Sequence, residues 1–314
     1  MTNPVLAFVF PGQGSQQIGM LAEAAEAFPE INATFSEASS VLGYDLWDLC
    51  QNGSQEDINL TERTQPLLLT ASVALYRAWL SQGGAKPALM AGHSLGEWSA
   101  LVCAGVLAFE DAVRLVRERG RLMQEAVPPG EGAMAAVIGL DDQAVESACA
   151  DAAQGAIVAA VNYNSPGQVV IAGSSAAVER AIEACKAAGA KRAMPLPVSA
   201  PFHTELMRPA AEKLAPQIEA TTFLEPQTPV VHNVHAKMES DPSAIKSLMV
   251  EQIYSPVRWT ACVEAMAAAG IGQLVECGPG KVLAGLAKRI DRNLVAHNIE
   301  TPAQLSEAVK STAQ

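Results

Sequence analysis

The sequence predicts an α/β protein: a large domain with a mostly parallel sheet, interrupted by a small inserted α+β subdomain. In both flanks of the chain, strand-length apolar segments alternate with helical segments, which is typical of a parallel sheet. Between the flanks, residues 133–197 follow a different order, in which two strands come in direct succession. A chain of 314 residues, 49% of them hydrophobic, can bury cores of this size.

The N-terminal flank begins with the apolar segment 5–10 (VLAFVF), which predicts a buried strand leading into a glycine-rich turn. Residues 64–80 predict a strongly apolar helix with Pro66 near its start, where proline is tolerated. Residues 87–94 predict a strand that ends in a sharp turn. Two further helices are expected, at 97–105 and 110–125.

The middle segment, 133–197, predicts a subdomain of its own. An apolar strand at 133–140 precedes a helix at 141–152, whose first residues are acidic and suit the positive end of a helix. Two strands joined by the turn YNSPG follow, and then a helix with serine caps at its start and glycine at its end. The last strand contains prolines and is expected at a sheet edge. The order β-α-β-β-α-β is ferredoxin-like.

The large domain resumes after this insertion. Residues 228–234 and 273–278 predict core strands, and 257–270 and 281–291 predict helices. The expected boundaries are 1–128 and 199–314 for the discontinuous large domain and 129–198 for the subdomain.

Charge and cysteine content exclude several functions. The net charge is −12, which disfavours nucleic-acid binding because that function needs a basic face. The six cysteines have no CxxC spacing, so no metal site is expected, and their apolar surroundings fit a reducing compartment.

The start of the chain lacks a signal peptide, and NYNSPGQ would break a helix in the uncharged stretch 152–178. We therefore expect a cytoplasmic protein without a membrane segment.

The most informative motif is G-x-S-x-G at residues 92–96 (GHSLG). It follows an apolar strand and precedes a helix, as a nucleophile elbow does. At this helix N-terminus, backbone N–H groups would stabilise negative charge on a bound carbonyl oxygen. Ser94 is therefore the candidate nucleophile. The alternative is a glycine-serine turn that only joins a strand to a helix.

A serine nucleophile needs a base, and histidine titrates in the right pH range. Of the five histidines, His203 is favoured because it follows the insertion directly, where the chain re-enters the large domain. His93 adjoins the serine, but neighbouring side chains on such a turn point apart. His232 and His235 could form a weak metal pair, although a structural role is favoured without a third ligand. The glycine-rich loop after the first strand could lend an N–H group to an oxyanion hole.

Four arginines lie in the segment 114–121 (RLVRERGR). Most are expected on a solvated helix face, because Val113, Val116 and Leu122 form an apolar stripe. One of them could reach the cleft and bind a substrate carboxylate through two hydrogen bonds. The spacing alone does not identify which one.

Together these segments strongly resemble the malonyl-CoA:acyl carrier protein transacylases of type II fatty acid synthesis. The resemblance covers nearly the whole chain and implies an α/β-hydrolase-like large domain with an inserted ferredoxin-like subdomain. It rests on six motifs in order: FPGQGSQ (10–16), TQP (64–66), GHSLGE (92–97), RERGRLMQ (117–124), APFH (200–203) and VECGPGKVL (275–283).

The resemblance implies the catalytic residues. Ser94 would be the acyl-accepting nucleophile and His203 its base. The backbone N–H groups of Gln13 and Leu95 would form the oxyanion hole. A backbone carbonyl, expected at Gln252, would orient the histidine in place of the usual carboxylate.

It also implies the residues that select the substrate. Arg119 matches the arginine that binds the malonyl carboxylate. Phe202, before the histidine, and Leu95, after the serine, match relatives that load malonyl rather than methylmalonyl units. The implied reaction is ping-pong transfer of a malonyl group from malonyl-CoA to the phosphopantetheine thiol of acyl carrier protein, through a malonyl-serine, by a monomer with no bound cofactor. A serine esterase or thioesterase and a catalytically silent carrier-binding protein remain as alternatives.

Partner binding raises a question of charge, since acyl carrier protein and CoA are both acidic and a chain at −12 should repel them at long range. Two basic groups are local exceptions, and we expect one or both to line the mouth of the cleft. Ordinary solvated surface is the alternative. The first group is Lys281, Lys288, Arg289 and Arg292, and the second is Lys186, Lys191 and Arg192.

Overall fold

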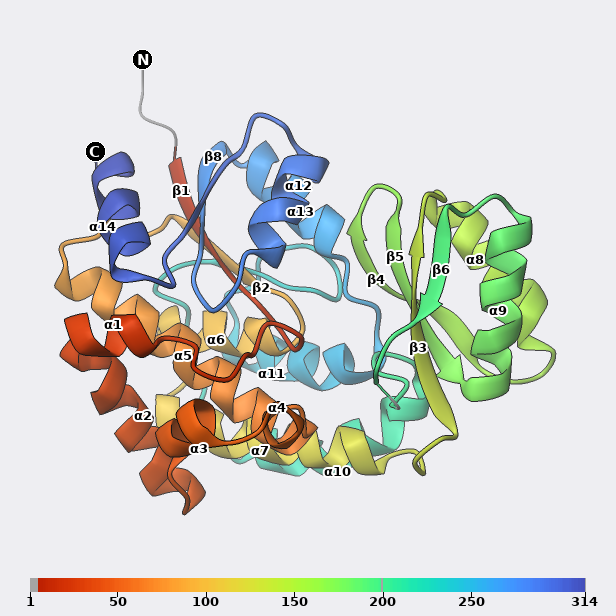
Figure 1. The fold of residues 1–314 in the computed structure, drawn as a ribbon, viewed down its shortest axis with the longest axis horizontal. Helices are drawn as coiled ribbons and strands as arrows, with labels where there is room; N and C mark the ends of the chain where they lie inside the picture. Colours follow the sequence, from red (N-terminus) through yellow and green to blue (C-terminus); the bar gives the residue numbers. More distant parts are fainter. Residues whose placement is uncertain (1–4, 199, 314) are drawn as a thin grey trace.

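A five-stranded parallel sheet forms the centre of the larger part of the molecule (Figure 1). The computed structural model describes residues 5–198 and 200–313. The strands are β1 (Val5–Phe10), β2 (Leu89–Gly92), β7 (Val230–Val231), β8 (Ile271–Glu276) and β9 (Val295–Asn298), in the order β7-β2-β1-β8-β9. The predicted α/β class with a mostly parallel sheet is therefore confirmed.

The central strand β1 is buried on both faces, as its uninterrupted apolar sequence predicts. Phe8 and Phe10 belong to the larger core, whereas Ala7 and Val9 belong to a second core on the other face. The second core is closed by α12 (Trp259–Ala268) and α13 (Val282–Ile290). The larger core is built from α1 (Ala22–Ala27), α2 (Pro29–Leu42), α3 (Leu46–Asn52), α4 (Gln55–Ile58), α5 (Thr61–Ser81), α6 (Leu95–Cys103), α7 (Phe109–Glu125), α10 (Arg208–Glu219), α11 (Pro242–Glu251) and α14 (Pro302–Ser311).

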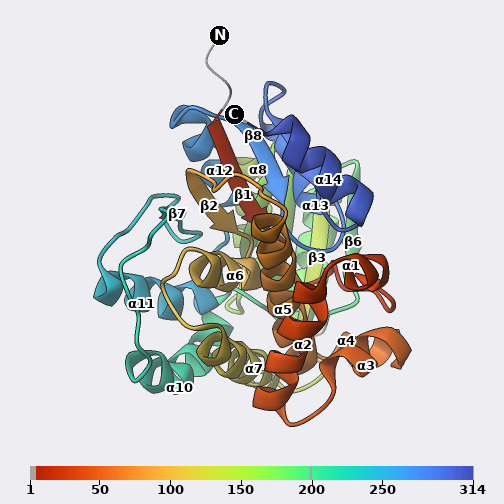
Figure 2. The ribbon, with the colours of Figure 1, turned by 90° about the vertical axis from the view of Figure 1, so that its left-hand side faces the viewer.

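The rotated view shows how these helices are layered. α7 and α10 lie side by side in both views, α6 lies between α7 and the sheet, and α11 packs against α10 (Figure 2). Among residues 5–198 and 200–313, no helix combines the length and the apolar character that crossing a bilayer requires.

A second, antiparallel sheet forms the smaller part of the molecule, with the predicted order β-α-β-β-α-β. It has the strand order β4-β5-β3-β6, which is ferredoxin-like and places the proline-containing last strand at an edge, as expected. Both helices pack on this sheet and form a separate core. The elements are β3 (Gly132–Ile138), α8 (Asp142–Ala153), β4 (Val158–Ser165), β5 (Gln168–Ser174), α9 (Ser175–Ala187) and β6 (Arg192–Pro195).

The structure corrects several local predictions. The turn between β4 and β5 is only Pro166-Gly167, because Tyr163, Asn164 and Ser165 continue the strand. The side chain of Ser174, the residue before α9, makes no capping hydrogen bond, in contrast to Asp141, which caps α8.

Two other segments differ in length. The segment 228–234 contributes only the two-residue strand β7 at the sheet edge. Helix α5 begins at Thr61, so Pro66 lies inside it rather than near its start. The boundary drawn at residue 199 lies outside the described residues, and the domain limits remain a prediction.

The smaller sheet is joined to the larger part by hydrogen bonds that run along β4. The backbone N–H of Tyr163 donates to the Val257 carbonyl at 3.0 Å, and the N–H of Val257 donates to the Val161 carbonyl at 2.7 Å. The hydroxyl of Thr260 donates to the Tyr163 carbonyl at 3.0 Å. These contacts place β4 beside the carboxyl end of the parallel sheet, where ligands bind in open α/β folds.

Candidate active site

The turn between β2 and α6 places Ser94 immediately before the first residue of α6. Ser94 has a positive φ of 52°, which is strained for a residue with a side chain and is found at functional turns. The flanking glycines permit this turn because a Cβ on Gly92 would lie 1.9 Å from the Gly96 carbonyl group. A Cβ on Gly96 would lie 2.1 Å from the Phe10 carbonyl oxygen. The motif thus forms a strand-turn-helix elbow.

The structure brings Ser94 and His203 together. Ser94 Oγ lies 2.7 Å from His203 Nε2, and His203 Nδ1 lies 2.9 Å from the backbone oxygen of Gln252. Because a carbonyl only accepts, Nδ1 carries the proton and Nε2 faces the serine with its lone pair. Burial and the nearby charge of Arg119 lower the pKa of His203 to about 3. The imidazole is therefore neutral, and able to accept a proton, at neutral pH.

Arg119 is the one arginine of the segment 114–121 that is buried, with 1% of its surface exposed. Its Nη1 donates to Gln65 Oε1 at 2.8 Å, its Nη2 donates to Gln252 Oε1 at 2.9 Å, and Nη2 lies 3.4 Å from Ser94 Oγ. Burial lowers the pKa of Arg119 to about 10, and Glu97 opposes this shift. The guanidinium thus stays charged at neutral pH.

Close packing of α7 against α5 puts this arginine in place. A Cβ on Gly120 would lie 2.5 Å from the Thr61 carbonyl oxygen, so only glycine lets the helices approach this closely. The other three arginines of the segment, Arg114, Arg117 and Arg121, are exposed or half-buried, as expected for a solvated helix face.

A cavity of about 470 Å³ opens over Ser94 and His203, with residues of the smaller sheet forming part of its wall. Gln13, Leu95, Arg119 and Phe202 line it as well. The remaining lining residues are Gly14, Gln16, Gln55, Asn59, Gln65, His93, Met123, Met134, Asn162, Leu196, Pro197 and Val198. The residues of the two basic groups are absent from this set.

The glycine-rich loop lies directly against the elbow. A Cβ on Gly12 would lie 2.5 Å from the His93 carbonyl oxygen, so only glycine at position 12 lets the loop approach the elbow this closely. Within the described residues, the backbone N–H groups of Gln13 and Leu95 donate to no protein acceptor. Both therefore remain available to a ligand in the cavity.

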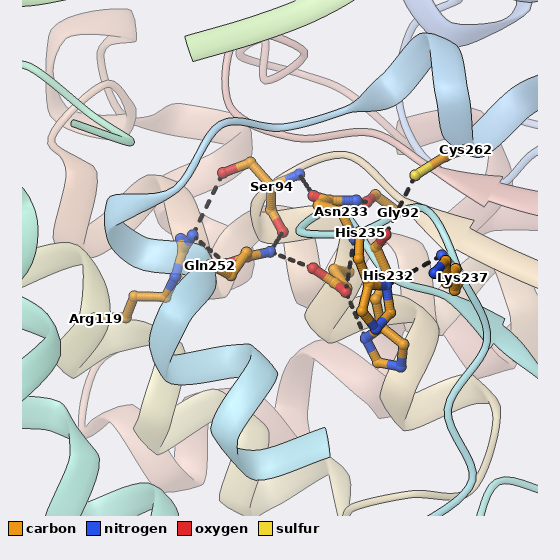
Figure 3. Close-up of polar contacts among 10 residues, drawn as sticks. Gly92, Ser94, Arg119, His232, Asn233, His235, Lys237, Gln252 and Cys262 are labelled. Atoms are coloured by element: carbon orange, nitrogen blue, oxygen red, sulfur yellow. Dashed lines mark hydrogen bonds and ion pairs between the residues drawn. The ribbon is translucent and has the colours of Figure 1, made fainter. Parts of the chain in front are cut away.

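Three residues beneath the elbow make contacts that the sequence-based prediction did not include, although it favoured a structural role for His232. Asn233 and His232 are labelled in Figure 3. The side chain of Asn233 accepts a hydrogen bond from the Ser94 N–H at 2.9 Å and donates to the Gly92 carbonyl at 2.7 Å. Glu97 and His232 lie below it, joined by a 2.7 Å contact between Oε1 and Nδ1. The sequence did offer one signal for Glu97, because it is the single acidic residue in the otherwise apolar helix segment EWSALVCAG.

The other histidines have structural partners. His93 Nε2 lies 2.7 Å from Asn164 Oδ1, and burial lowers the pKa of its ring. His232 Nδ1 contacts the Glu97 carboxylate, which is a structural partner of the kind that was favoured for this residue. In the described part of the chain, no cluster of three or more His, Cys, Asp or Glu residues could hold a metal ion.

Known proteins match this chain along nearly its whole length. The model of the family described as "Acyl transferase domain" matches residues 7–305. The malonyl CoA-acyl carrier protein transacylase of Escherichia coli K12 is 60% identical over 304 residues, which cover 97% of this chain and 98% of the relative. The Bacillus subtilis protein of the same name is 45% identical over 98% of this chain and 96% of the relative.

Solved structures agree with these matches. An acyl carrier protein S-malonyltransferase from Vibrio cholerae is 58% identical, with a TM-score of 0.95 and coverage of 96% of this chain and 99% of the other. A malonyl-transacylase in complex with a type II PKS acyl-carrier protein is also 58% identical, with a TM-score of 0.96 and coverage of 98% and 99%. On this evidence the chain belongs to the acyl transferase family and, within it, to the malonyl CoA-acyl carrier protein transacylases.

Proposed function

We propose that this protein transfers the malonyl group of malonyl-CoA to the phosphopantetheine thiol of acyl carrier protein through a malonyl ester on Ser94. The observation that carries the proposal is the 2.7 Å contact between Ser94 Oγ and His203 Nε2 in a cavity that also holds the buried guanidinium of Arg119. The names of the relatives, and the carrier-protein complex of one of them, support the same reaction.

In the first half-reaction, Ser94 Oγ attacks the thioester carbonyl while His203 Nε2 accepts the hydroxyl proton. The N–H groups of Gln13 and Leu95 stabilise the tetrahedral oxyanion. The carbon–sulfur bond then breaks, and His203 returns the proton to the CoA thiolate. In the second half-reaction the phosphopantetheine thiol attacks the ester, and the same steps run in reverse order.

The Gln252 carbonyl has the role that a carboxylate has in a catalytic triad. It holds the proton on His203 Nδ1, and it supplies a dipole rather than a full charge to the imidazolium that forms. Arg119 contributes to the low pKa of His203. A malonyl carboxylate bound to Arg119 would offset that charge and raise the basicity of His203. Binding of the correct substrate would thereby strengthen the base.

Substrate choice follows from the charge and shape of the cavity. A charge-assisted pair between Arg119 and the malonyl carboxylate contributes roughly 1.5–3 kcal/mol. Phe202 and Leu95 fill space where a methylmalonyl branch would need room. Thioester exchange of this kind requires no metal or redox cofactor, and we propose that the protein acts as a monomer in the cytoplasm.

Intact-mass spectrometry tests the proposal. Mixing with malonyl-CoA should add one malonyl group to the wild-type protein and none to Ser94→Ala. Phosphopantetheinylated acyl carrier protein should then remove the adduct and become malonylated, whereas the carrier without phosphopantetheine should leave it in place. Release of mainly free malonate with the loaded carrier present would instead identify a thioesterase. Absence of any adduct on the wild type would leave only a carrier-binding protein.

A further inference from the structure

Glu97 is a buried carboxylate that lies beneath the nucleophile and outside the cavity lining. It stands in the first turn of α6, three residues after Ser94. Both of its oxygens are hydrogen-bonded. Oε1 accepts from His232 Nδ1 at 2.7 Å and from the backbone N–H of Asn233 at 3.2 Å, and Oε2 accepts from Gln252 Nε2 at 2.6 Å. These donors come from separate segments of the chain, so the carboxylate ties them together beneath the elbow.

The charge of Glu97 determines which way the Gln252 amide points. A carboxylate only accepts hydrogen bonds, so the NH₂ group of Gln252 must face Glu97. The same NH₂ group donates to the Ser94 carbonyl at 2.9 Å. Gln252 Oε1 must then point the other way, where it accepts from Arg119 Nη2 at 2.9 Å (Figure 3). Each polar atom of this amide has a matching partner in this orientation alone.

Rotation of the amide by half a turn would disrupt the site. Gln252 Nε2 would face Arg119 Nη2, so that two donors would meet, and Oε1 would face the Ser94 carbonyl, so that two acceptors would meet. In a buried site both mismatches are costly, because no water can separate the groups. Glu97 is also the buried negative charge that supports ionisation of Arg119.

We propose that Glu97 is a positioning residue for malonyl transfer, which fixes the Gln252 side-chain amide and thereby holds Arg119 where it meets the malonyl carboxylate. The inference rests on the proposed function. Glu97 acts at a distance, through one glutamine side chain, and touches no reacting atom. The backbone carbonyl of the same glutamine faces His203, so one residue links the buried charge to both the base and the substrate-binding arginine.

A double-mutant cycle tests this link. The variants are Glu97→Gln, Gln252→Met and the two combined, and Gln252→Met keeps the backbone carbonyl that His203 needs. The readout is kcat/KM for loading of Ser94 with malonyl-CoA divided by that with acetyl-CoA, because acetyl has no carboxylate for Arg119. Each single variant should lower this malonyl-to-acetyl ratio about tenfold, which is the order of one charge-assisted hydrogen bond. The double variant should lower it no further.

Glu276→Gln is the matched control. Glu276 is also 1% exposed and buried at a strand end, but Oε1 accepts from the backbone N–H of Ala284 in α13, away from the cavity. This variant should change the unfolding midpoint and leave the malonyl-to-acetyl ratio within about twofold of wild type. If Glu97→Gln does not fold, Glu97→Asp enters the same cycle, because it keeps the charge but withdraws it from Gln252.

A malonyl-to-acetyl ratio that Glu97→Gln leaves unchanged would overturn the inference, and so would additive losses in the double variant. A similar fall of the ratio in Glu276→Gln would also overturn it, since any buried carboxylate would then give the effect. A wild-type protein that is not malonylated at all would contradict the proposed function instead, so the two failures are distinguishable.

Discussion

The arginine of the candidate site is unusual because the fold keeps it charged without a directly bonded carboxylate. Arg119 donates to two neutral amides, Gln65 and Gln252, and its Nε has no partner among the described residues. A guanidinium held in this way still has donors to offer an anion. This is the property that a site for a substrate carboxylate requires.

Replacing Arg119 by alanine should therefore reduce malonyl loading of Ser94 much more than acetyl loading. We expect kcat/KM for malonyl-CoA to fall about ten- to a hundredfold, the loss of a charge-assisted hydrogen bond, with a clearly smaller change for acetyl-CoA. Arg121→Ala is the control, because Arg121 lies two residues later on the same helix and pairs with Glu118 and Glu125 at the surface. Equal losses for the two acyl groups would remove the role of Arg119 in selecting malonyl.

The low pKa of His203 gives a prediction about stability and pH. The folded imidazole has a pKa of about 3, whereas an unfolded one titrates near 6.5. Between these values only the unfolded chain binds the proton, so this residue's contribution to folding is complete above about pH 6.5 and is lost as the pH falls toward 3. From pH 6.5 to 5 the loss is about 2 kcal/mol.

Urea denaturation of the wild type and of His203→Gln over pH 5 to 8 checks this. The unfolding free energy of the wild type should fall more steeply below pH 6.5 than that of the variant. If the unfolding free energies of the wild type and the variant change in parallel with pH, His203 has the same pKa in the folded and the unfolded chain. Malonyl loading by the wild type should show no loss from protonation of this histidine down to pH 5.

At the scale of elements, the connection between β2 and α6 decides whether the site exists. Its geometry depends on two glycines whose added Cβ atoms would overlap backbone atoms rather than flexible side chains. Backbone contacts of this kind are relieved only by moving the strand or the helix.

Gly92→Ala should therefore lower the unfolding free energy by at least about 2 kcal/mol and abolish loading of Ser94. Gly285→Ala is the matched control, because Gly285 lies in α13, where an added Cβ meets nothing within 4 Å. That variant should gain roughly 0.5–1 kcal/mol of stability through helix propensity. Urea denaturation and intact-mass loading measure both effects, and normal loading by Gly92→Ala would contradict the proposed geometry.

The elements that were predicted well have a continuous apolar sequence, or residues at their ends that are typical of a helix start or stop. The strand 5–10 matches β1, and Asp141 and Gly189 mark the helices of the small sheet. The segment 228–234 was predicted less well, because only two of its apolar residues pair with a neighbouring strand. Strand β9 has an exposed or half-buried surface, and so no apolar pattern revealed it.

The candidate site was predictable where a local motif carries the chemistry. The glycines around Ser94 made the elbow visible, whereas the choice of Arg119 among four arginines needed the family resemblance. Glu97 and Asn233, and the partner of His232, were missed because they depend on contacts between residues 135 to 155 positions apart, such as those of Glu97 with His232 and Gln252. Sequence spacing carries no information about contacts of this kind.

At the scale of the whole molecule, a net charge of −12 opposes the approach of an acidic carrier protein and of CoA. Salt screens charges that lie more than about 10 Å from a docked partner, so the charges close to the cavity mouth decide whether the partner is attracted there. The loop before α13 abuts the glycine-rich loop that lines the cavity, since a Cβ on Gly280 would lie 4.0 Å from Ser15. Lys288 and Arg289 are exposed in the last turn of the same helix.

We therefore propose α13 as a docking surface for acyl carrier protein, with Lys191 and Arg192 of the smaller sheet as a second exposed group. Lys288→Glu combined with Arg289→Glu should raise the KM for the carrier about tenfold at low salt, as two surface ion pairs would predict. The rise should shrink as salt screens the charges. Malonyl loading from CoA should change less, because the cavity lining is unaltered.

The control for net charge is Lys213→Glu combined with Lys310→Glu, two exposed lysines on α10 and α14. Both double variants make the protein more acidic by the same amount, so only a local effect can separate them. Steady-state transfer to the carrier at low and high salt measures the difference. Equal rises in KM would assign the effect to overall charge. No rise in either variant would mean that the carrier docks elsewhere, and reversal of Lys191 and Arg192 would then be the next comparison.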